Sequence, residues 1–352
     1  MNQPILVTVA DEEESRAAAS LLLAQQTRQR ALDARLPAAQ ARSELEAALA
    51  ESLDSDEHPL VALDEDGQVR GYVRPSVWQL SLTSILRAFL STRNGVARTL
   101  ALPDPADADA RAVATALLAA LSEFWQSHQT TGDLIRWPSA DPWLEPLLAE
   151  QGFRLDSVCA MCWLQPLEES ARASLPPFVT RTARPEDEED LVGPLEEELR
   201  YHERYTPFVR SSPIVLEAFR RKLARLWQGV SLAEGAPLVL VVEQERQIVA
   251  MAENTLLDVS LDDETGFTPP GRYGCIDNVS VREERRGQGI GRLLLQAIFD
   301  AFAATGVQLD GYILWYNPDN PQAGRFWPRT GFVPLWTTYQ RLHTASGSQG
   351  GT

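Results

Sequence analysis

Three glycines at alternate positions, Gly287, Gly289 and Gly291, stand where the chain passes from a strand pattern into a helix pattern. Apolar residues recur at helical spacing from Ile290 onward, whereas the residues up to Val281 alternate as in a strand. The first turn of a helix has amide N–H groups without intrahelical partners and a partial positive charge, so it attracts anions. Glycine lets phosphate oxygens approach the backbone without an intervening side chain. The segment therefore predicts a diphosphate-binding loop.

Arginines flank the glycines, and Arg285, Arg286 and Arg292 add positive charge for the same anion. The spacing GxGxG departs from the GxGxxG fingerprint of dinucleotide-binding folds, and no lysine follows the glycines as it does in a P-loop. Both of these nucleotide-binding loops are therefore excluded. A glycine-rich turn without a ligand is the remaining alternative.

The elements that must position the loop can be placed on either side of it. The second half is expected to begin with the strand FVTRTA and a helix opened by Arg184-Pro185, followed by a helix over 213–227. Two hairpin strands, LVLVVE and IVAMAENTLLD, precede the strand YGCIDNVSV that leads into the loop. After the helix come the strand GYILWY, a short helix ending at Gly331 and the strand TTYQRLH. The loop is thus expected in the middle of an α/β domain.

The first half can be read in the same order of elements. Gly152-Phe153 and Gly331-Phe332 are related by a shift of 179 positions (331 − 152). The same shift matches residues of similar character along both halves without a gap: Leu100 with Val279, Leu102 with Val281, Gly132 with Gly311, and Trp137 with Tyr316. We therefore interpret the chain as two copies of one fold.

The copies are expected at 1–166 and 178–345, joined by a linker at 167–177 and followed by a disordered tail at 346–352. The linker is small, polar and ends in prolines, and the tail has no apolar residue to bury. A chain of 352 residues is long enough for two hydrophobic cores of this size.

Composition excludes several classes of function. Hydrophobic residues make up 44% and charged residues 23%, as in ordinary globular proteins. The formal net charge of -17 argues against a nucleic-acid partner. No run approaches 18 apolar residues, and the chain does not open on a basic segment before a long apolar one, so we expect a cytoplasmic protein without membrane contact. Four scattered histidines predict no metal site.

Two spaced motifs resemble those of the GNAT acyltransferase superfamily. Arg286-x-x-Gly289-x-Gly291 is similar to its phosphate loop, and Asn320-x-x-Ala323-x-x-Phe326-Trp327-x-x-x-Gly331-Phe332 is similar to its NxxAxxFYxxxGF helix. The segment RTARPEDEEDL resembles the opening of the family's domain. The resemblance covers the second half. It implies a mixed α/β (α+β) fold in each copy: a mostly antiparallel sheet with a splayed central parallel pair, flanked by helices.

The resemblance also implies acetyl-CoA as the cofactor, bound in the C-terminal copy. The pantetheine arm would pair with the backbone of Val279, Ser280 and Val281, where the strands splay and leave peptide groups for a ligand. The thiol end would meet Asn320, Phe326 and Trp327. The pyrophosphate would be held by the whole loop, namely Arg286, Gly287, Gln288, Gly289, Ile290, Gly291 and Arg292.

Acyl transfer to an amine requires a proton acceptor for the nitrogen and stabilisation of the carbonyl oxygen. The family resemblance assigns the second role to the backbone N–H near Val279. Asp277, two residues earlier, and Glu253, inside an otherwise apolar strand, are the candidate bases. For each carboxylate, a hydrogen-bonded or solvated strand position is an equally good interpretation.

Trp327 occupies the position where the family often has a tyrosine as general acid. Indole does not donate a proton to a thiolate at useful pH. Either the thiolate leaves unassisted, or Tyr316 or another group replaces the missing acid. Trp327 can instead form an apolar wall.

Acceptor specificity is expected from the first two helices and the hairpin loops. In ELRYHERYTPF, Tyr201, His202 and Tyr205 are candidate pocket residues, and 201 and 205 are neighbours at helical spacing. An ordinary contact between helices explains the same residues.

The first copy lacks the glycines of the loop. The 179 shift places Asp107, Ala108, Asp109, Ala110, Arg111 and Ala112 on the loop positions 286–291. Carboxylates at two of these positions would repel phosphates, so we predict that the N-terminal copy does not bind the cofactor and packs on the active copy as a dimer partner would.

The sequence therefore predicts a tandem GNAT N-acetyltransferase with one site, which transfers acetyl from acetyl-CoA to a primary amine of a small molecule. The internal pseudo-dimer predicts a monomer or a homodimer. A non-catalytic acyl-CoA sensor or scaffold is the first alternative, favoured by Trp327 and the degenerate first copy. An acetyltransferase acting on protein lysines or N-termini is a weaker one.

Overall fold

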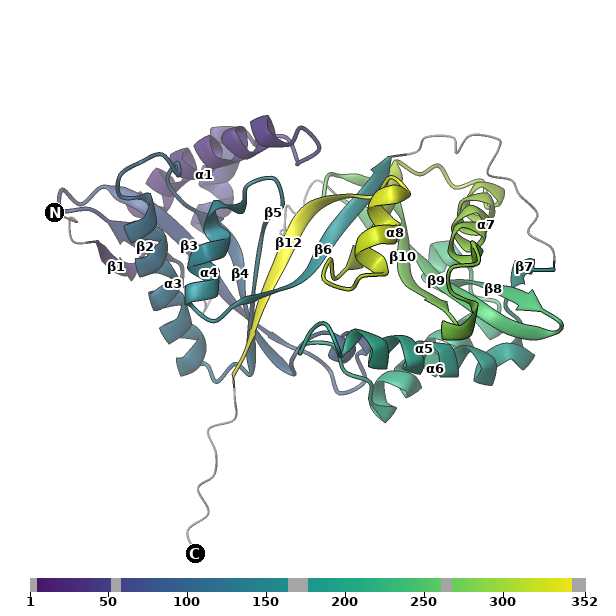
Figure 1. The fold of residues 1–352 in the computed structure, drawn as a ribbon. Helices are drawn as coiled ribbons and strands as arrows, with labels where there is room; N and C mark the ends of the chain where they lie inside the picture. Colours follow the sequence, from purple (N-terminus) through teal and green to yellow (C-terminus); the bar gives the residue numbers. More distant parts are fainter. Residues whose placement is uncertain (1–4, 52–57, 164–176, 261–267, 344–352) are drawn as a thin grey trace, which may run out of the picture.

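The computed structural model describes residues 5–51, 58–163, 177–260 and 268–343 (Figure 1). The expected linker, apart from its last residue, and the expected tail lie outside these ranges. The domain bounds expected from the sequence therefore remain a prediction. The pairing of the strands shows how the two halves are joined.

Twelve strands form one sheet in the order β1-β2-β3-β4-β5-β12-β6-β11-β10-β9-β8-β7. The strands are β1 (Leu6–Val9), β2 (Leu60–Leu63), β3 (Val69–Gln79), β4 (Arg93–Ala101), β5 (Gly132–Pro138), β6 (Arg154–Trp163), β7 (Val179–Thr182), β8 (Leu238–Gln244), β9 (Gln247–Val259), β10 (Gly271–Val281), β11 (Gly311–Tyr316) and β12 (Val333–Leu342). Two pairs are parallel, β4 with β5 and β10 with β11. The other neighbours in the described sheet are antiparallel, which confirms the expected fold class.

Helices cover both faces of the sheet in each half (Figure 1). They are α1 (Glu12–Leu32), α2 (Arg42–Glu51), α3 (Ala110–Ser127), α4 (Glu145–Glu150), α5 (Glu188–His202), α6 (Pro213–Trp227), α7 (Ile290–Ala304) and α8 (Ala323–Arg329). In the C-terminal half, α7 and α8 pack on one face, around Leu294, Ile298 and Trp327, while α5 and α6 pack on the other. None of the described helices is long and apolar enough to cross a membrane.

The element bounds confirm the internal repeat. Strand β6 shifted by 179 positions falls on β12 residue for residue, and β4 and β5 fall on β10 and β11 to within one residue at either end. Helix α3 likewise falls on α7 to within two residues. The first helices do not match: α1 has 21 residues and α5 only 15, because Pro207 follows soon after His202 and cannot continue a helix.

The two copies exchange their last strands. Strand β12 lies between β5 and β6, and β6 pairs with β11 (Figure 1). Each half of the sheet is thus completed by a strand from the other half of the sequence. The hydrophobic pattern does not predict this exchange, because β6 and β12 occupy equivalent positions and either could close either copy.

Candidate active site

The central parallel strands separate next to the glycine loop. Strands β10 and β11 pair from Tyr273 with Gly311 to Ile276 with Leu314, and the pairing ends there. The register of β10 on β9 shifts at Asp277, which places a β-bulge where the strands part. Bulges near active sites redirect side chains and end strand pairing. A cavity of about 930 Å³ opens at this place.

The glycine loop borders the cavity and begins α7. Gly287 has φ +77° and Gly289 has φ +84°, a left-handed conformation that favours glycine. Gly289 is the N-cap residue of α7. It makes no side-chain hydrogen bond, so the N–H groups in the first turn of α7 have no capping side chain as a partner. A Cβ at Gly291 would lie 3.2 Å from the Phe326 ring, which leaves little room for a side chain. This backbone fits a diphosphate at the start of the helix.

Arg286 is turned toward the protein rather than toward the loop's open side. Its Nε donates a hydrogen bond to the Val281 carbonyl at 3.0 Å. Its guanidinium carbon lies 4.7 Å from the centroid of the Tyr201 ring, and Nη2 lies 4.0 Å from the Glu198 carboxylate. The side chain of Arg286 therefore fixes the loop against β10 and α5.

Most of the residues predicted for the cofactor line this cavity. They are Val279, Val281, Arg286, Gly287, Gly289, Ile290, Gly291, Arg292, Asn320, Phe326 and Trp327. Ser280 and Gln288 are not among the lining residues: the Ser280 hydroxyl donates to Pro194 O at 3.2 Å, and the Gln288 amide donates to Glu284 O at 3.3 Å. The sequence motifs therefore identify residues that meet in space.

Asn320 and the aromatic pair shape the wall opposite α5. The Asn320 carboxamide oxygen accepts from the backbone N–H of Gln322 at 3.0 Å and of Ala323 at 3.3 Å, so it caps α8. Trp327 is 8% exposed and contacts Phe326 edge to face, with ring centroids 4.9 Å apart. Its position is that of an apolar wall.

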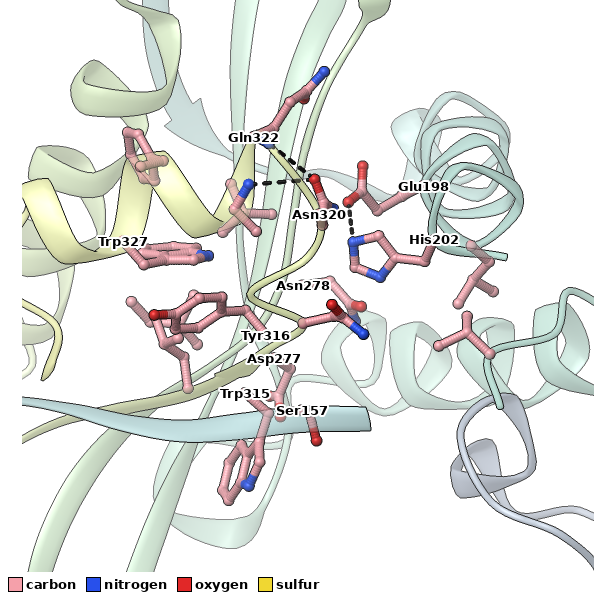
Figure 2. Close-up of a pocket in the computed structure, with 18 of the residues that line it drawn as sticks. Ser157, Glu198, His202, Asp277, Asn278, Trp315, Tyr316, Asn320, Gln322 and Trp327 are labelled. Carbon is pink, nitrogen blue, oxygen red and sulfur yellow. Dashed lines mark hydrogen bonds and ion pairs between the residues drawn. The ribbon is translucent and has the colours of Figure 1, made fainter. Parts of the chain in front are cut away.

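Tyr316 lines the same cavity, and burial raises the pKa of its phenol. Figure 2 shows Tyr316 and Trp327 together on one side of the cavity, and Glu198 with His202 on the other. A neutral Tyr316 can donate a proton, a chemistry that Trp327 lacks.

Asp277 lines the cavity at the bulge. Its two carboxylate oxygens accept from Thr255 Oγ1 at 2.8 Å and from Cys275 Sγ at 3.4 Å. The residue is exposed, unlike its neighbours Cys275 and Ile276, so its carboxylate is accessible from the cavity. This position fits a proton acceptor.

Glu253 lies behind the cavity wall and does not line it. The side chain is 0% exposed, forms an ion pair with Lys222 and accepts a hydrogen bond from the Asn278 amide. Burial raises the pKa of Glu253 and outweighs the attraction to Lys222. Burial opposes the charge on Lys222, but Glu253 and Asp277 outweigh it and raise the pKa of the amine. Lys222 and Asn278, which do line the cavity, separate Glu253 from it.

Of the three residues expected to contact the acceptor, His202 lines the cavity and Tyr201 and Tyr205 are not among its lining residues. The imidazole Nε2 of His202 lies 2.9 Å from the Glu198 carboxylate (Figure 2). The two tyrosine hydroxyls bond each other at 3.1 Å. The two side chains are neighbours as expected, but α5 ends at His202 and Tyr205 lies in the turn after it, so the contact joins the last turn of the helix to that turn.

Two parts of the wall have no signal in the sequence. Asp156 of β6 is 7% exposed and accepts hydrogen bonds from Gln340 at 2.8 Å, Ser157 at 3.0 Å and Thr206 at 3.1 Å. Burial raises the pKa of this carboxyl. Ile85, Leu86, Phe89 and Leu90 of the first half also line the cavity. No local sequence pattern predicts that Asp156 or this segment lines the cavity, because their partners are distant in sequence.

A glutamine of α1 closes the matching gap in the N-terminal half. The Gln25 carboxamide donates to Leu100 O at 2.8 Å and accepts from Leu102 N at 2.7 Å. Leu100 and Leu102 are the repeat equivalents of Val279 and Val281. Since N–H and C=O of one strand residue point to the same side, the corresponding groups of Val279 and Val281 face the gap between β10 and β11. In the C-terminal half, α5 ends at His202, and the gap between β10 and β11 is part of the cavity.

The equivalent of the glycine loop in the first half is also occupied. Arg70 of β3 donates to Asp109 at 2.8 Å and reaches Asp107 at 3.4 Å. The pairing with Arg70 lowers the pKa of Asp109 and keeps it charged. An intramolecular guanidinium thus pairs with the two carboxylates that replace loop residues.

Comparison with known proteins finds one family match, in the second half of the chain. Residues 199–332 match the model of the acetyltransferase (GNAT) family. No curated protein sequence matches the chain.

Solved structures match nearly the whole chain at low identity. A GCN5-related N-acetyltransferase from Sphaerobacter thermophilus shares 17% identity with a TM-score of 0.54, over 96% of this chain and 95% of that one. A tandem GNAT protein from the clavulanic acid biosynthesis pathway shares 15% identity with a TM-score of 0.46, over 98% and 100%. An acetyltransferase of the GNAT family from Colwellia psychrerythraea shares 12% with a TM-score of 0.42, over 96% and 100%.

The first of these structures shares the fold of both halves, and the family match covers the glycine loop and the helix after it. The bounds of the repeated elements show the same fold twice along the chain. Each half of the chain therefore has a GNAT-like fold, and residues 199–332 match the model of the acetyltransferase (GNAT) family.

Proposed function

We propose that the C-terminal half transfers an acetyl group from acetyl-CoA to the primary amine of a small molecule. One observation carries this proposal: the splayed edge of β10, the uncapped start of α7 and the carboxylate of Asp277 all open into one cavity. A pantetheine arm, a pyrophosphate and an amine are the groups that such a set of edges and charges would take.

The proposed reaction forms a C–N bond between the amine and the acyl carbon and breaks the C–S bond of the thioester. Acetyl-CoA supplies the activated acyl group and a thiolate leaving group. Asp277 takes the proton that the amine loses, directly or through water. The N–H of Val279 faces the gap and stabilises the negative charge that develops on the carbonyl oxygen.

Tyr316 is the proposed proton donor to the departing sulfur. Its hydroxyl stays protonated because burial raises the pKa of the phenol. Trp327 then serves as an apolar wall that excludes water from the thioester. Glu253 is proposed to act through Lys222 and Asn278, which it holds in place, rather than to touch the amine.

The proposed cofactor contacts follow the cavity from one end to the other. The loop from Arg286 to Arg292 holds the pyrophosphate. The backbone N–H groups of Gly287, Gly289 and Ile290 donate most of the hydrogen bonds to its oxygens. The backbone N–H and C=O groups of Val279 and Val281 that face the gap between β10 and β11 form hydrogen bonds with the pantetheine amides. The N-terminal half, whose own gap Gln25 fills, holds no cofactor in this proposal.

Release of CoA during incubation with acetyl-CoA and a panel of primary amines tests the proposal. We expect amine-dependent turnover, and a kcat about 10² to 10⁴ lower for Asp277→Asn. Asp258→Asn is the matched control, because Asp258 is also a strand carboxylate, 59% exposed and paired with Arg272. Tight CoA binding without release in the presence of any amine would refute the enzymatic proposal.

Trp327 favours a second candidate function, a non-catalytic acyl-CoA sensor. A protein of this kind would be stabilised by CoA in thermal unfolding without consuming acetyl-CoA. Trp327→Tyr separates the two: in an enzyme it changes an existing turnover rate, whereas in a sensor neither variant turns over.

A further inference from the structure

One connection of the N-terminal half crosses to the C-terminal half. The segment between β3 and β4 contains the short helix η2 (Ile85–Ala88), and Ala88 is buried in the core formed by α5 and α6. Three hydrogen bonds hold this segment there: Arg210 N to Ala88 O at 2.8 Å, Arg221 Nη2 to Thr83 O at 3.0 Å, and Gln340 Nε2 to Phe89 O at 3.3 Å. The segment is thus a fixed part of the cavity wall.

The side chains that this segment presents to the cavity are apolar. Ile85, Leu86, Phe89 and Leu90 line it, together with Leu199 and Val209 of the C-terminal half. Leu86 is 48% exposed and belongs to this group of apolar lining residues, so an apolar patch faces the cavity. Covering such a surface with an apolar group of a ligand releases water and favours binding.

Two polar residues beside this wall, Asp156 and Gln340, are already paired with groups of the protein. The Asp156 carboxylate accepts three hydrogen bonds, and the Gln340 amide nitrogen donates to both Asp156 and Phe89 O. A ligand hydroxyl or phosphate placed there would have to compete with these bonds or lie against apolar side chains, which costs desolvation. The wall therefore discriminates against polar acceptors.

We propose that residues 85–90 of the N-terminal half form the far end of the acceptor pocket, and that the acceptor is a primary amine carrying an apolar chain or ring. The inference rests on the proposed acetyl transfer and adds the class of amine. The amino group lies at Asp277, and the apolar group lies on the wall formed by Leu86 and Phe89. The copy without a cofactor site thereby selects the substrate of the other copy.

Two amines with the same two-carbon spacing test the proposal, 2-phenylethylamine and ethanolamine. Each is assayed for kcat/KM with acetyl-CoA and for equilibrium binding to the CoA-loaded protein by calorimetry. We expect the wild type to favour 2-phenylethylamine by about 30-fold, within the range that apolar pockets achieve. Leu86→Glu should lower that ratio at least about tenfold.

Leu82→Glu is the matched control, since Leu82 lies in the same segment, is 74% exposed and is not among the lining residues. It should leave the ratio unchanged. Equal use of both amines by the wild type, or an unchanged ratio in Leu86→Glu, would overturn the proposal.

Binding separates this inference from the proposed function. If neither amine releases CoA but 2-phenylethylamine binds and Leu86→Glu weakens that binding, the pocket stands and the proposed transfer fails. If acetyl transfer occurs with ethanolamine but not with 2-phenylethylamine, the apolar pocket is refuted and the proposed transfer stands. If 2-phenylethylamine does not bind, the apolar pocket is refuted, and CoA release alone decides the proposed transfer.

Discussion

At the scale of single residues, the glycines of the loop could be predicted from the sequence and Asp156 could not. Gly287, Gly289 and Gly291 act through their own backbone, so their type and spacing carry the information. Asp156 stands in a strand that reads as an ordinary one, and its partners Thr206 and Gln340 lie 50 and 184 positions away. Chemistry that depends on such distant partners has no local signal.

Asp156 predicts a pH dependence of stability. Its carboxyl has a raised pKa in the folded protein because of burial, so the folded state favours the protonated form. Its contribution is therefore most favourable at acidic pH and is lost as the pH rises through the folded pKa. In Asp156→Asn the oxygen can still accept from Gln340 and Ser157, and the new amide can donate to the Thr206 hydroxyl.

Denaturant unfolding of both proteins between pH 4 and pH 8 measures this effect. The free energy of unfolding of the wild type, relative to Asp156→Asn, should decrease as the pH rises. Asp156→Ala, which leaves three donors without their acceptor, should cost about 1–3 kcal/mol. A wild type that gains stability over Asp156→Asn with rising pH would contradict the assignment.

At the scale of elements, the two copies differ most in their first helix. Helix α1 extends far enough for Gln25 to bond both Leu100 and Leu102, whereas α5 ends at His202 and leaves the matching gap to the cavity. The 179 shift correctly predicts the later strands and helices. It fails at these helices because Pro207 follows α5 closely, and a helix does not continue through it.

Replacing Gln25 by alanine leaves the carbonyl of Leu100 and the amide of Leu102 without their partner. We expect Gln25→Ala to destabilise the protein by about 1–3 kcal/mol in denaturant unfolding, without creating a second CoA site, because Asp107 and Asp109 remain. Ser20→Ala, at an exposed position of the same helix, should change stability by at most about 0.5 kcal/mol. Equal stability of the two variants would contradict the role of Gln25.

At the scale of the whole molecule, the exchanged strands join the two halves into one sheet. Strand β12 fills the N-terminal half between β5 and β6, and β6 completes the C-terminal half on β11. Neither half of the sequence contains all the strands that its own half of the sheet needs. The internal repeat could be recognised from the sequence, but the choice of partner for β6 and β12 is made by tertiary packing.

This arrangement predicts that the halves unfold together. We expect a single calorimetric transition, and Leu117→Ala, a core change in α3 that costs about 2–5 kcal/mol, should lower the midpoint for the whole protein. Loss of the near-ultraviolet signal and loss of CoA binding should follow the same curve. Two separate transitions, with only one shifted by Leu117→Ala, would show that the halves are independent.

Calorimetric binding of CoA to the wild type and to two glycine variants tests most directly whether the glycine loop forms a single cofactor site. The wild type should bind one CoA per chain, and Gly289→Asp should abolish binding by placing a carboxylate at the start of α7. Gly306→Asp introduces the same residue just beyond the other end of α7, also at a positive φ of +71° and with open space for its Cβ, and should bind CoA as the wild type does. Unchanged CoA affinity in Gly289→Asp, or two CoA molecules bound per chain, would contradict a single site built on this loop.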